Sequence, residues 1–134
     1  MIILDTSFLV AYFNQGDENH PKVMKIMEEI VGRKFGPMCM TDYIFNETVT
    51  VAMIKMKDLQ KATRIGDYTI KALKMIRVGE DTFLQAWKIF QSQKGTRLGF
   101  TDCTTISVMK YHGIDNIATF DKDLKIHGIN CVNL

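Results

Sequence analysis

The feature that most constrains the fold is the opening segment MIILD, a short unbroken apolar run that ends in an acid. A run of this length, rich in isoleucine, is typical of a strand covered on both faces, as the strands of parallel sheets are. We therefore expect a buried strand over residues 1–5. The carboxylate of Asp5 would then lie at the carboxyl end of that strand.

Further short apolar segments alternate with segments of helical periodicity along the rest of the chain. We expect more strands at residues 36–41, 75–79, 116–119 and 130–132. We expect helices at residues 7–13, 21–31, 42–57, 58–73, 81–94 and 101–112. Thr6, Asp81 and Thr101 are the predicted helix caps, and Gly32 and Gly113 the predicted stops. The alternation predicts one three-layer α/β domain over residues 1–134, with a parallel sheet and helices on both faces.

Composition excludes several classes of protein. No apolar run approaches the roughly 20 residues that a membrane span needs, and the N-terminus lacks the basic flank of a signal peptide. The three cysteines are odd in number and form no C-x-x-C pair, so we expect buried, reduced thiols and no zinc site. We therefore expect a cytoplasmic protein.

Positive charge gathers in the middle of the chain. Residues 33–77 carry nine basic and four acidic side chains, whereas the whole chain has a net charge of only +2. The basic residues of this belt are Arg33, Lys34, Lys55, Lys57, Lys61, Arg64, Lys71, Lys74 and Arg77. Such a belt suits a phosphate backbone, with Lys57, Lys61 and Arg64 as candidate RNA contacts, although on charge alone a solvated helical face is the commoner explanation. Met53, Ile54 and Met56 make a dimer face a competing use of the same helices.

Four acids fall at related positions in the predicted topology. Asp5 ends the first strand, and Asp121 lies two residues past the fourth. Glu47 is just over one turn into the helix after the second strand, and Asp102 is in the first turn of the helix before the fourth. All four positions lie near the carboxyl edge of the sheet, where open parallel sheets bind ligands. We therefore expect the four carboxylates to converge on one rim.

A convergence of four carboxylates has a chemical consequence. Like charges repel, and burial makes each one costlier, so the cluster needs cations. Oxygen ligands suit Mg²⁺ or Mn²⁺, and two such ions about 4 Å apart could serve phosphodiester cleavage. Taken singly, each acid also has a structural explanation as a helix cap, a surface residue, a helix-dipole partner or a turn residue. The joint placement is what favours the metal site.

The residues that carry these acids also match a known family. The sequence resembles the PIN-domain ribonucleases, in particular the VapC-like toxins of prokaryotic toxin–antitoxin pairs. The matching segments are MIILDTSFLVAYF, IFNETVT, GFTDCTTISVMKYHGI and IATFDKDLKI. They span nearly the whole chain in the order that the family shows.

The resemblance implies a five-stranded parallel sheet flanked by helices and an endoribonuclease that uses Mg²⁺ or Mn²⁺. It also implies a homodimer and a small antitoxin protein as partner. By residue, it implies that Asp5, Glu47, Asp102 and Asp121 are the metal-site and catalytic acids. Thr6, Ser7 and Thr119 match nearby hydroxyl positions that could orient them, and Asp123 matches a position that is commonly acidic.

Other functions remain open. A metal-dependent phosphatase or phosphoacceptor domain would also use an acid after the first strand, but the second acid expected two residues later is here Ser7. An RNA-processing PIN nuclease without an antitoxin would carry the same four acids. A binding module without activity would be expected to have lost at least one of them.

Overall fold

The computed structural model of this chain describes residues 1–32 and 34–132, except for the side chain of residue 126. Arg33 of the basic belt lies outside the described residues. The elements are β1 (Ile2–Leu4), α1 (Thr6–Phe13), α2 (His20–Val31), β2 (Met38–Thr41), α3 (Asp42–Met56), α4 (Leu59–Ala72), β3 (Lys74–Ile76), α5 (Glu80–Gln91), α6 (Phe100–His112), β4 (Asn116–Ala118), η1 (Lys122–His127) and β5 (Asn130–Val132).

The five strands form one parallel sheet in the order β3-β2-β1-β4-β5. Strand β1 is central, and its side chains are fully buried, as the continuous apolar run predicted. The chain moves outward from β1 through β2 to β3, then crosses back to β4 and β5 on the other side. The strand order therefore reverses at β1 and β4, and residues that follow these two strands meet at the place where such sheets bind ligands.

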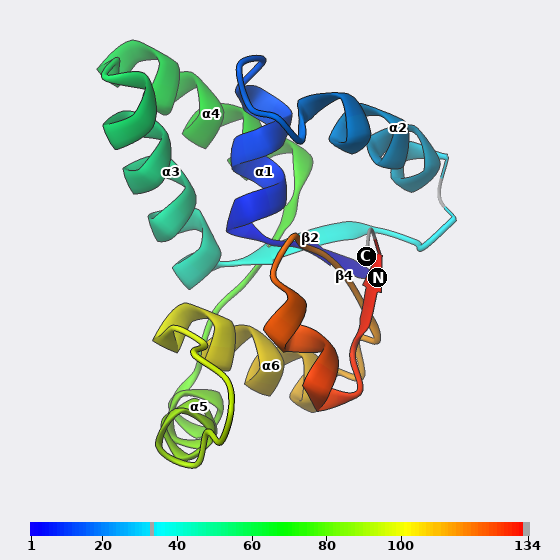
Figure 1. Cartoon of the computed structure of the whole chain (residues 1–134), viewed down its shortest axis with the longest axis vertical. Helices are drawn as coiled ribbons and strands as arrows, with labels where there is room; N and C mark the ends of the chain where they lie inside the picture. Colours follow the sequence, from blue (N-terminus) through cyan, green and yellow to red (C-terminus); the bar gives the residue numbers. More distant parts are fainter. Residues whose placement is uncertain (33, 133–134) are drawn as a thin grey trace.

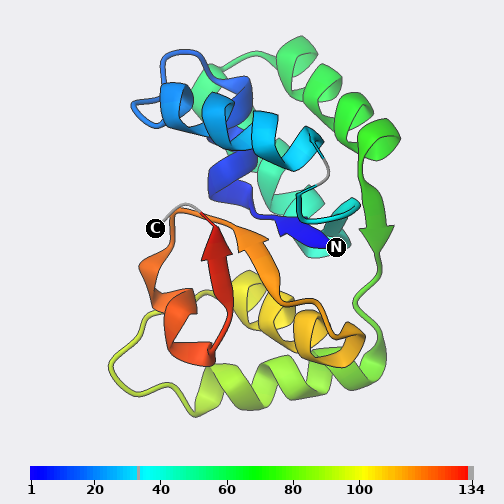
Figure 2. The same ribbon diagram turned by 90° about the vertical axis from the view of Figure 1, so that its right-hand side faces the viewer.

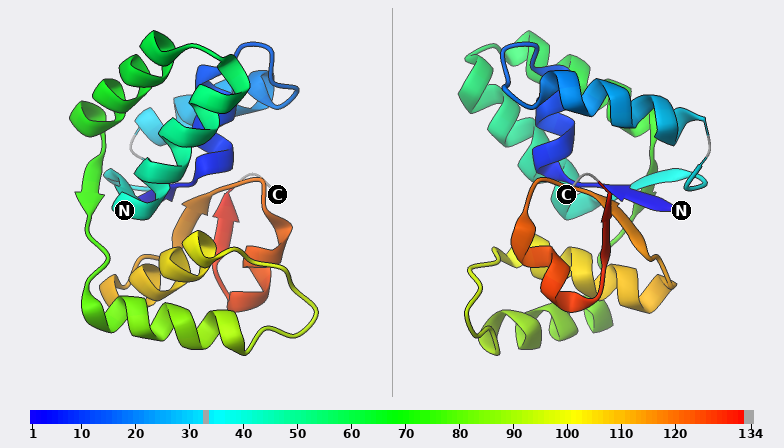
Figure 3. Two further views of the ribbon diagram at one scale, coloured as in Figure 1. Left: turned by 90° about the vertical axis from the view of Figure 1, so that its left-hand side faces the viewer. Right: turned by 45° about the vertical axis from the view of Figure 1, so that its right-hand side comes forward.

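Helices cover both faces of the sheet (Figures 1 and 2). Helices α1, α2, α3 and α4 lie on one side, while α5, α6 and η1 lie on the other (Figure 3). One continuous core joins the layers, with Phe8 and Ile44 from one side and Ile106 and Met109 from the other. The predicted three-layer α/β fold with a five-stranded parallel sheet is confirmed. No helix among the described residues is both long and apolar enough to span a bilayer.

Three predicted helix caps are wrong, each by one or two positions. The N-caps are Asp5 for α1, Gly79 for α5 and Gly99 for α6, rather than Thr6, Asp81 and Thr101. In α6 the cap position does not need a side chain of its own, because a residue inside the first turn of the helix supplies the capping hydrogen bond. The Asp102 carboxylate accepts a hydrogen bond from the Gly99 backbone N–H at 3.0 Å, so glycine suffices as the cap.

The helix predicted at residues 81–94 is observed as α5, and its apolar face is only partly buried. Ala86 is fully buried, but Phe83, Trp87 and Phe90 are each 38–47% exposed. These three rings surround Phe100, the first residue of α6, with centroid distances between 5.1 and 6.3 Å. The face therefore packs against the start of α6 rather than into the central core. The cysteines behave as expected, since Cys39, Cys103 and Cys131 are all buried free thiols.

Candidate active site

Asp5 is the most enclosed acid of the site, with 4% of its surface exposed. Its Oδ2 atom accepts hydrogen bonds from Thr119 Oγ1 at 2.8 Å and from Ser7 Oγ at 3.0 Å. Burial raises the pKa of Asp5, these hydrogen bonds oppose the rise, and the charge of Asp121 adds to it. The backbone explains the position, because Asp5 follows the central strand and caps α1.

Glu47 reaches the same rim from α3. Its Oε2 atom accepts a 2.9 Å hydrogen bond from Thr6 Oγ1, the residue next to Asp5. The pKa of Glu47 is raised, chiefly by burial; the hydrogen bond from Thr6 opposes this, and the negative charge of Asp5 reinforces it. This hydrogen bond between two predicted site residues therefore holds the Glu47 side chain against the start of α1.

Asp102 also has a strongly raised pKa. Burial is the main cause, and together with the charges of Asp5, Asp121 and Glu47 it raises the pKa of Asp102 from 3.8 to about 7. The hydrogen bond from Gly99 opposes the rise. Since charge–charge effects of this kind require proximity, the four acids from four separate segments converge, as their placement in the sequence predicted.

Asp121 and Asp123 differ in what they contact. Asp121 caps η1 through its Oδ1 atom, which accepts from Asp123 N at 2.9 Å, and its charge acts on both Asp5 and Asp102. Asp123 instead uses Oδ2 to accept a 3.2 Å hydrogen bond from Arg97 N in the loop before α6. Asp121 therefore belongs with Asp5, Glu47 and Asp102 to one group, called the carboxylate cluster below. Asp123 instead stabilises the neighbouring loop through a hydrogen bond.

No cation of the chain neutralises this cluster within the described residues. The ion pairs found there are Lys34 with Glu29 at 3.1 Å and Arg77 with Asp42 at 3.9 Å, and neither includes a site acid. No three carboxylate, imidazole or thiol side chains of the described residues already enclose a metal position. The all-oxygen donor set nevertheless fits Mg²⁺ or Mn²⁺ by its chemistry.

The basic belt does not form one surface. Lys61 and Arg64 line a polar hollow of about 580 Å³ together with Lys55, which the sequence placed in the belt but not among the RNA contacts. Lys57 does not line that hollow and instead ends α3 in a left-handed conformation, with φ of 52°. The helical periodicity of α3 and α4 does not predict that Lys55 rather than Lys57 lines the hollow, because the loop after α1 also forms part of the lining.

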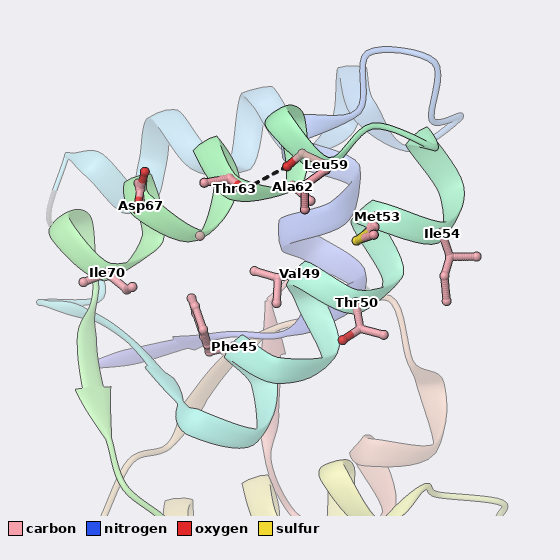
Figure 4. Close-up of a pocket in the computed structure, with 11 residues that line it drawn as sticks. Phe45, Val49, Thr50, Met53, Ile54, Leu59, Ala62, Thr63, Asp67 and Ile70 are labelled. Atoms are coloured by element: carbon pink, nitrogen blue, oxygen red, sulfur yellow. Dashed lines mark hydrogen bonds between the residues drawn. The ribbon is translucent and has the colours of Figure 1, made fainter.

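A separate hollow of about 460 Å³ lies between α3 and α4 and is almost wholly apolar (Figure 4). Phe45, Val49 and Ile70 line it, together with Met53 and Ile54 of the predicted dimer face. Met56, also assigned to that face, instead lines the polar hollow beside Lys55. The predicted dimer face is therefore divided between two different surfaces.

Comparison with models of known protein families identifies the family of this chain. The model of the PIN domain matches residues 2–129. This chain belongs to the PIN-domain family. The PIN domain is similar to the 23S rRNA-specific endonuclease VapC20 of Mycobacterium tuberculosis, with 26% identity over 129 residues. That match covers 96% of this chain and 95% of VapC20. The predicted resemblance to PIN-domain proteins of the VapC type is confirmed.

Solved structures agree on the fold. The crystal structure of Mycobacterium tuberculosis VapC20, described as a sarcin–ricin loop cleaving toxin, superposes with a TM-score of 0.88 at 24% identity over the full length of both chains. The Rickettsia felis VapBC2 complex, bound to a DNA fragment from its promoter, matches with a TM-score of 0.74 at 18% identity. That second match covers 99% of this PIN domain and 98% of the matched chain.

Proposed function

We propose that this PIN domain is a metal-dependent endoribonuclease whose metal-binding acids are Asp5, Glu47, Asp102 and Asp121. The observation that carries the proposal is the carboxylate cluster itself, in which three acids have raised pKa values and no ion pair with a cation among the described residues. Burial and repulsion between neighbouring carboxylates raise these pKa values, and bound divalent cations would compensate the negative charge. A bound Mg²⁺ or Mn²⁺ would lower the pKa of water and offset charge on the cleaved phosphate.

The side chains of the chain have distinct roles in this reaction. Asp5, Asp102 and Asp121 would hold the cation, and the hydroxyls of Ser7 and Thr119 fix the Asp5 carboxylate. Water would attack phosphorus in line with the departing ribose oxygen, so one P–O bond forms as another breaks, and the departing oxygen takes up a proton from solvent. Glu47 completes the metal site or accepts the proton of the attacking water, a role that suits its raised pKa.

The names of the relatives support a proposal for the biological setting. VapC20 is named as an endonuclease specific for 23S rRNA and as a toxin, and the Rickettsia felis structure is a VapBC complex. We propose by extension that this PIN domain is the toxin of a toxin–antitoxin pair, acts on RNA in the cytoplasm as a homodimer, and is inhibited by a small antitoxin protein. An RNA-processing role without an antitoxin predicts the same chemistry but no neighbouring inhibitor gene.

The phosphoacceptor alternative gains no support. Ser7 occupies the position where that class of protein places its second acid, and its hydroxyl donates to Asp5. That hydroxyl therefore helps to fix the carboxylate and cannot act as the missing acid.

The test is a cleavage assay on structured RNA with Mg²⁺, with Mn²⁺ and with chelator. Wild type should cut only with metal, and Asp5→Asn should lose at least about a hundredfold in rate. Asp115→Asn, which changes an exposed acid, is the matched control and should cut normally. Equal cleavage by Asp5→Asn, or by wild type in chelator, contradicts the proposal, and turnover of small phosphate esters without RNA cleavage favours the phosphatase alternative.

A further inference from the structure

Two neighbouring hollows, together called the groove below, lead away from residues next to the carboxylate cluster. The first, of about 410 Å³, starts at Thr6 and Ser7, whose hydroxyls bond to Glu47 and Asp5. It extends to the loop of residues 14–19. The second is the hollow of about 580 Å³ between this loop and helices α3 and α4. Both are lined by Asn14, Gly16 and Lys55, so the two hollows lie next to each other.

The far end of this groove carries positive charge that is not neutralised by the chain. Lys55, Lys61 and Arg64 line it, are exposed, and take part in none of the ion pairs found among the described residues. By contrast, Lys34 and Arg77 from the same basic belt are paired with acids. The three groove cations are therefore available to an anionic ligand.

The wall of the groove favours a polar occupant. Asn14 and Gln15 stand beside the cations in the second hollow, unlike the apolar lining of the hollow between α3 and α4 (Figure 4). Asp17 and Glu18 line the first hollow, where Lys55 is the only cation among the lining residues. The positive potential therefore increases away from the carboxylate cluster, towards Lys61 and Arg64.

We propose that an RNA strand leaves the carboxylate cluster along this groove, with its phosphates held by Lys55, Lys61 and Arg64. The inference rests on the proposed ribonuclease function and adds the path of the substrate on one side of the scissile phosphate. A phosphate chain matches the positive charge of the second hollow, where Lys55, Lys61 and Arg64 gather. Lys57, Lys71 and Lys74 of the basic belt lie outside this path.

The first arm of the test measures binding alone. A fluorescent single-stranded RNA is titrated in chelator with wild type, with a groove variant (Lys55→Gln, Lys61→Gln, Arg64→Gln) and with a matched control (Lys57→Gln, Lys71→Gln, Lys74→Gln). Both variants lose the same charge. The groove variant should bind at least about tenfold more weakly, and the slope of log Kd against log salt should fall by about two, since each phosphate contact contributes about 0.7. The control should bind like wild type.

The second arm measures cleavage with metal. A long RNA and a short one that ends near the cut site are compared for the same proteins. For the groove variant we expect a higher KM and an unchanged kcat with the long RNA. With the short RNA we expect the KM and kcat of wild type. Equal behaviour of the two triple variants overturns the proposal. So does a groove that binds an acidic peptide but no RNA, which would assign it to a protein partner. RNA binding that depends on the groove without any cleavage would instead reject the nuclease function and leave the groove assignment standing.

Discussion

Thr119 Oγ1 donates a 2.8 Å hydrogen bond to Oδ2 of Asp5, a residue 114 positions earlier in the chain. The same hydroxyl oxygen accepts from the backbone N–H of Asp121 at 3.0 Å. Ser7 adds a parallel link, donating to Asp5 and accepting from Phe120 N at 3.0 Å. Two hydroxyls thus connect the carboxyl ends of β1 and β4, where the strand order reverses. The orientations of Asp5 and Asp121 are therefore coupled.

The first prediction concerns this coupling. Thr119→Val keeps the side-chain shape but removes both the donor to Asp5 and the acceptor for Asp121. We expect the Mg²⁺ concentration for half-maximal cleavage to rise about tenfold or more, the usual effect of losing a group that orients a metal ligand. Thr105→Val is the control, because Thr105 is equally buried but bonds to the carbonyl of Thr101. Metal titrations that are the same for both variants contradict the positioning role.

The second prediction concerns Asp102 and the pH dependence of stability. Its pKa is raised in the folded protein to about 7, above its ordinary value of 3.8. The folded state therefore binds this proton more tightly than the unfolded state does. Its contribution to stability is complete below about pH 4 and is lost as the pH rises through about 7. The raised pKa values of Asp5 and Glu47 act in the same direction.

Urea denaturation in chelator at pH 5 and pH 8 measures this effect. Wild type should have a lower free energy of unfolding at pH 8, and Asp102→Asn should reduce the difference and be the more stable protein at pH 8. Added Mn²⁺ should stabilise wild type at pH 8 but stabilise Asp102→Asn much less. A pH dependence that is unchanged in Asp102→Asn would show that Asp102 titrates normally.

The third prediction separates the two late aspartates. Asp121 acts on Asp5 and Asp102 through its charge, whereas Asp123 fastens the loop at Arg97. Asp121→Asn should therefore weaken metal binding and reduce cleavage about a hundredfold, while Asp123→Asn should retain metal binding and lose only part of its thermal stability. Calorimetric metal titration and thermal melts of both variants measure the split. An Asp123→Asn variant that loses metal binding as strongly would assign both residues to the metal site.

The fourth prediction concerns two buried threonines, Thr48 within α3 and Thr41 at its N-cap. Thr48 Oγ1 is the buried side-chain polar atom without a hydrogen-bond partner among the described residues. Thr48→Val should therefore stabilise the fold by about 1 kcal/mol, because the unsatisfied hydroxyl is removed at nearly constant shape. Thr41→Val should destabilise it by about 1 kcal/mol, since Thr41 Oγ1 caps α3 by accepting from Ile44 N at 3.0 Å. Chemical denaturation compares them, and a loss of stability in Thr48→Val would mean that its hydroxyl is satisfied by water.

The sequence predicted the fold better than its details. The apolar run at β1 and the helical periodicity after it predicted a parallel sheet, and the acids at strand ends predicted convergence, because both follow from topology. The caps at Thr101 and Asp81 failed since several residue types can start a helix, and local hydrogen bonds such as that from Gly99 to Asp102 decide between them. The η1 helix was missed because six residues are too short for a periodic signal.

Tertiary contacts explain what else the sequence could not give. Lys55, Lys57 and Lys61 look alike as positions in a basic belt, yet only Lys55 and Lys61 line the groove, because the loop after α1 forms its other wall. Similarly, the family resemblance ranked Asp121 above Asp123 as a metal-site acid, but the contact of Asp123 with Arg97 N, 26 residues away, could not be predicted from the sequence. Pairings between distant segments carry no local sequence signal.

The central claim is that the four carboxylates bind a divalent cation as one site. Calorimetric titration of Mn²⁺ into wild type, Asp5→Asn and Asp102→Asn at pH 8 tests this most directly, with circular dichroism as the control for folding. We predict saturable binding by wild type, weakened at least about tenfold by either substitution in a folded protein. Wild-type affinity in both folded variants, or no saturable binding to wild type, would contradict the assignment of these carboxylates as a metal site.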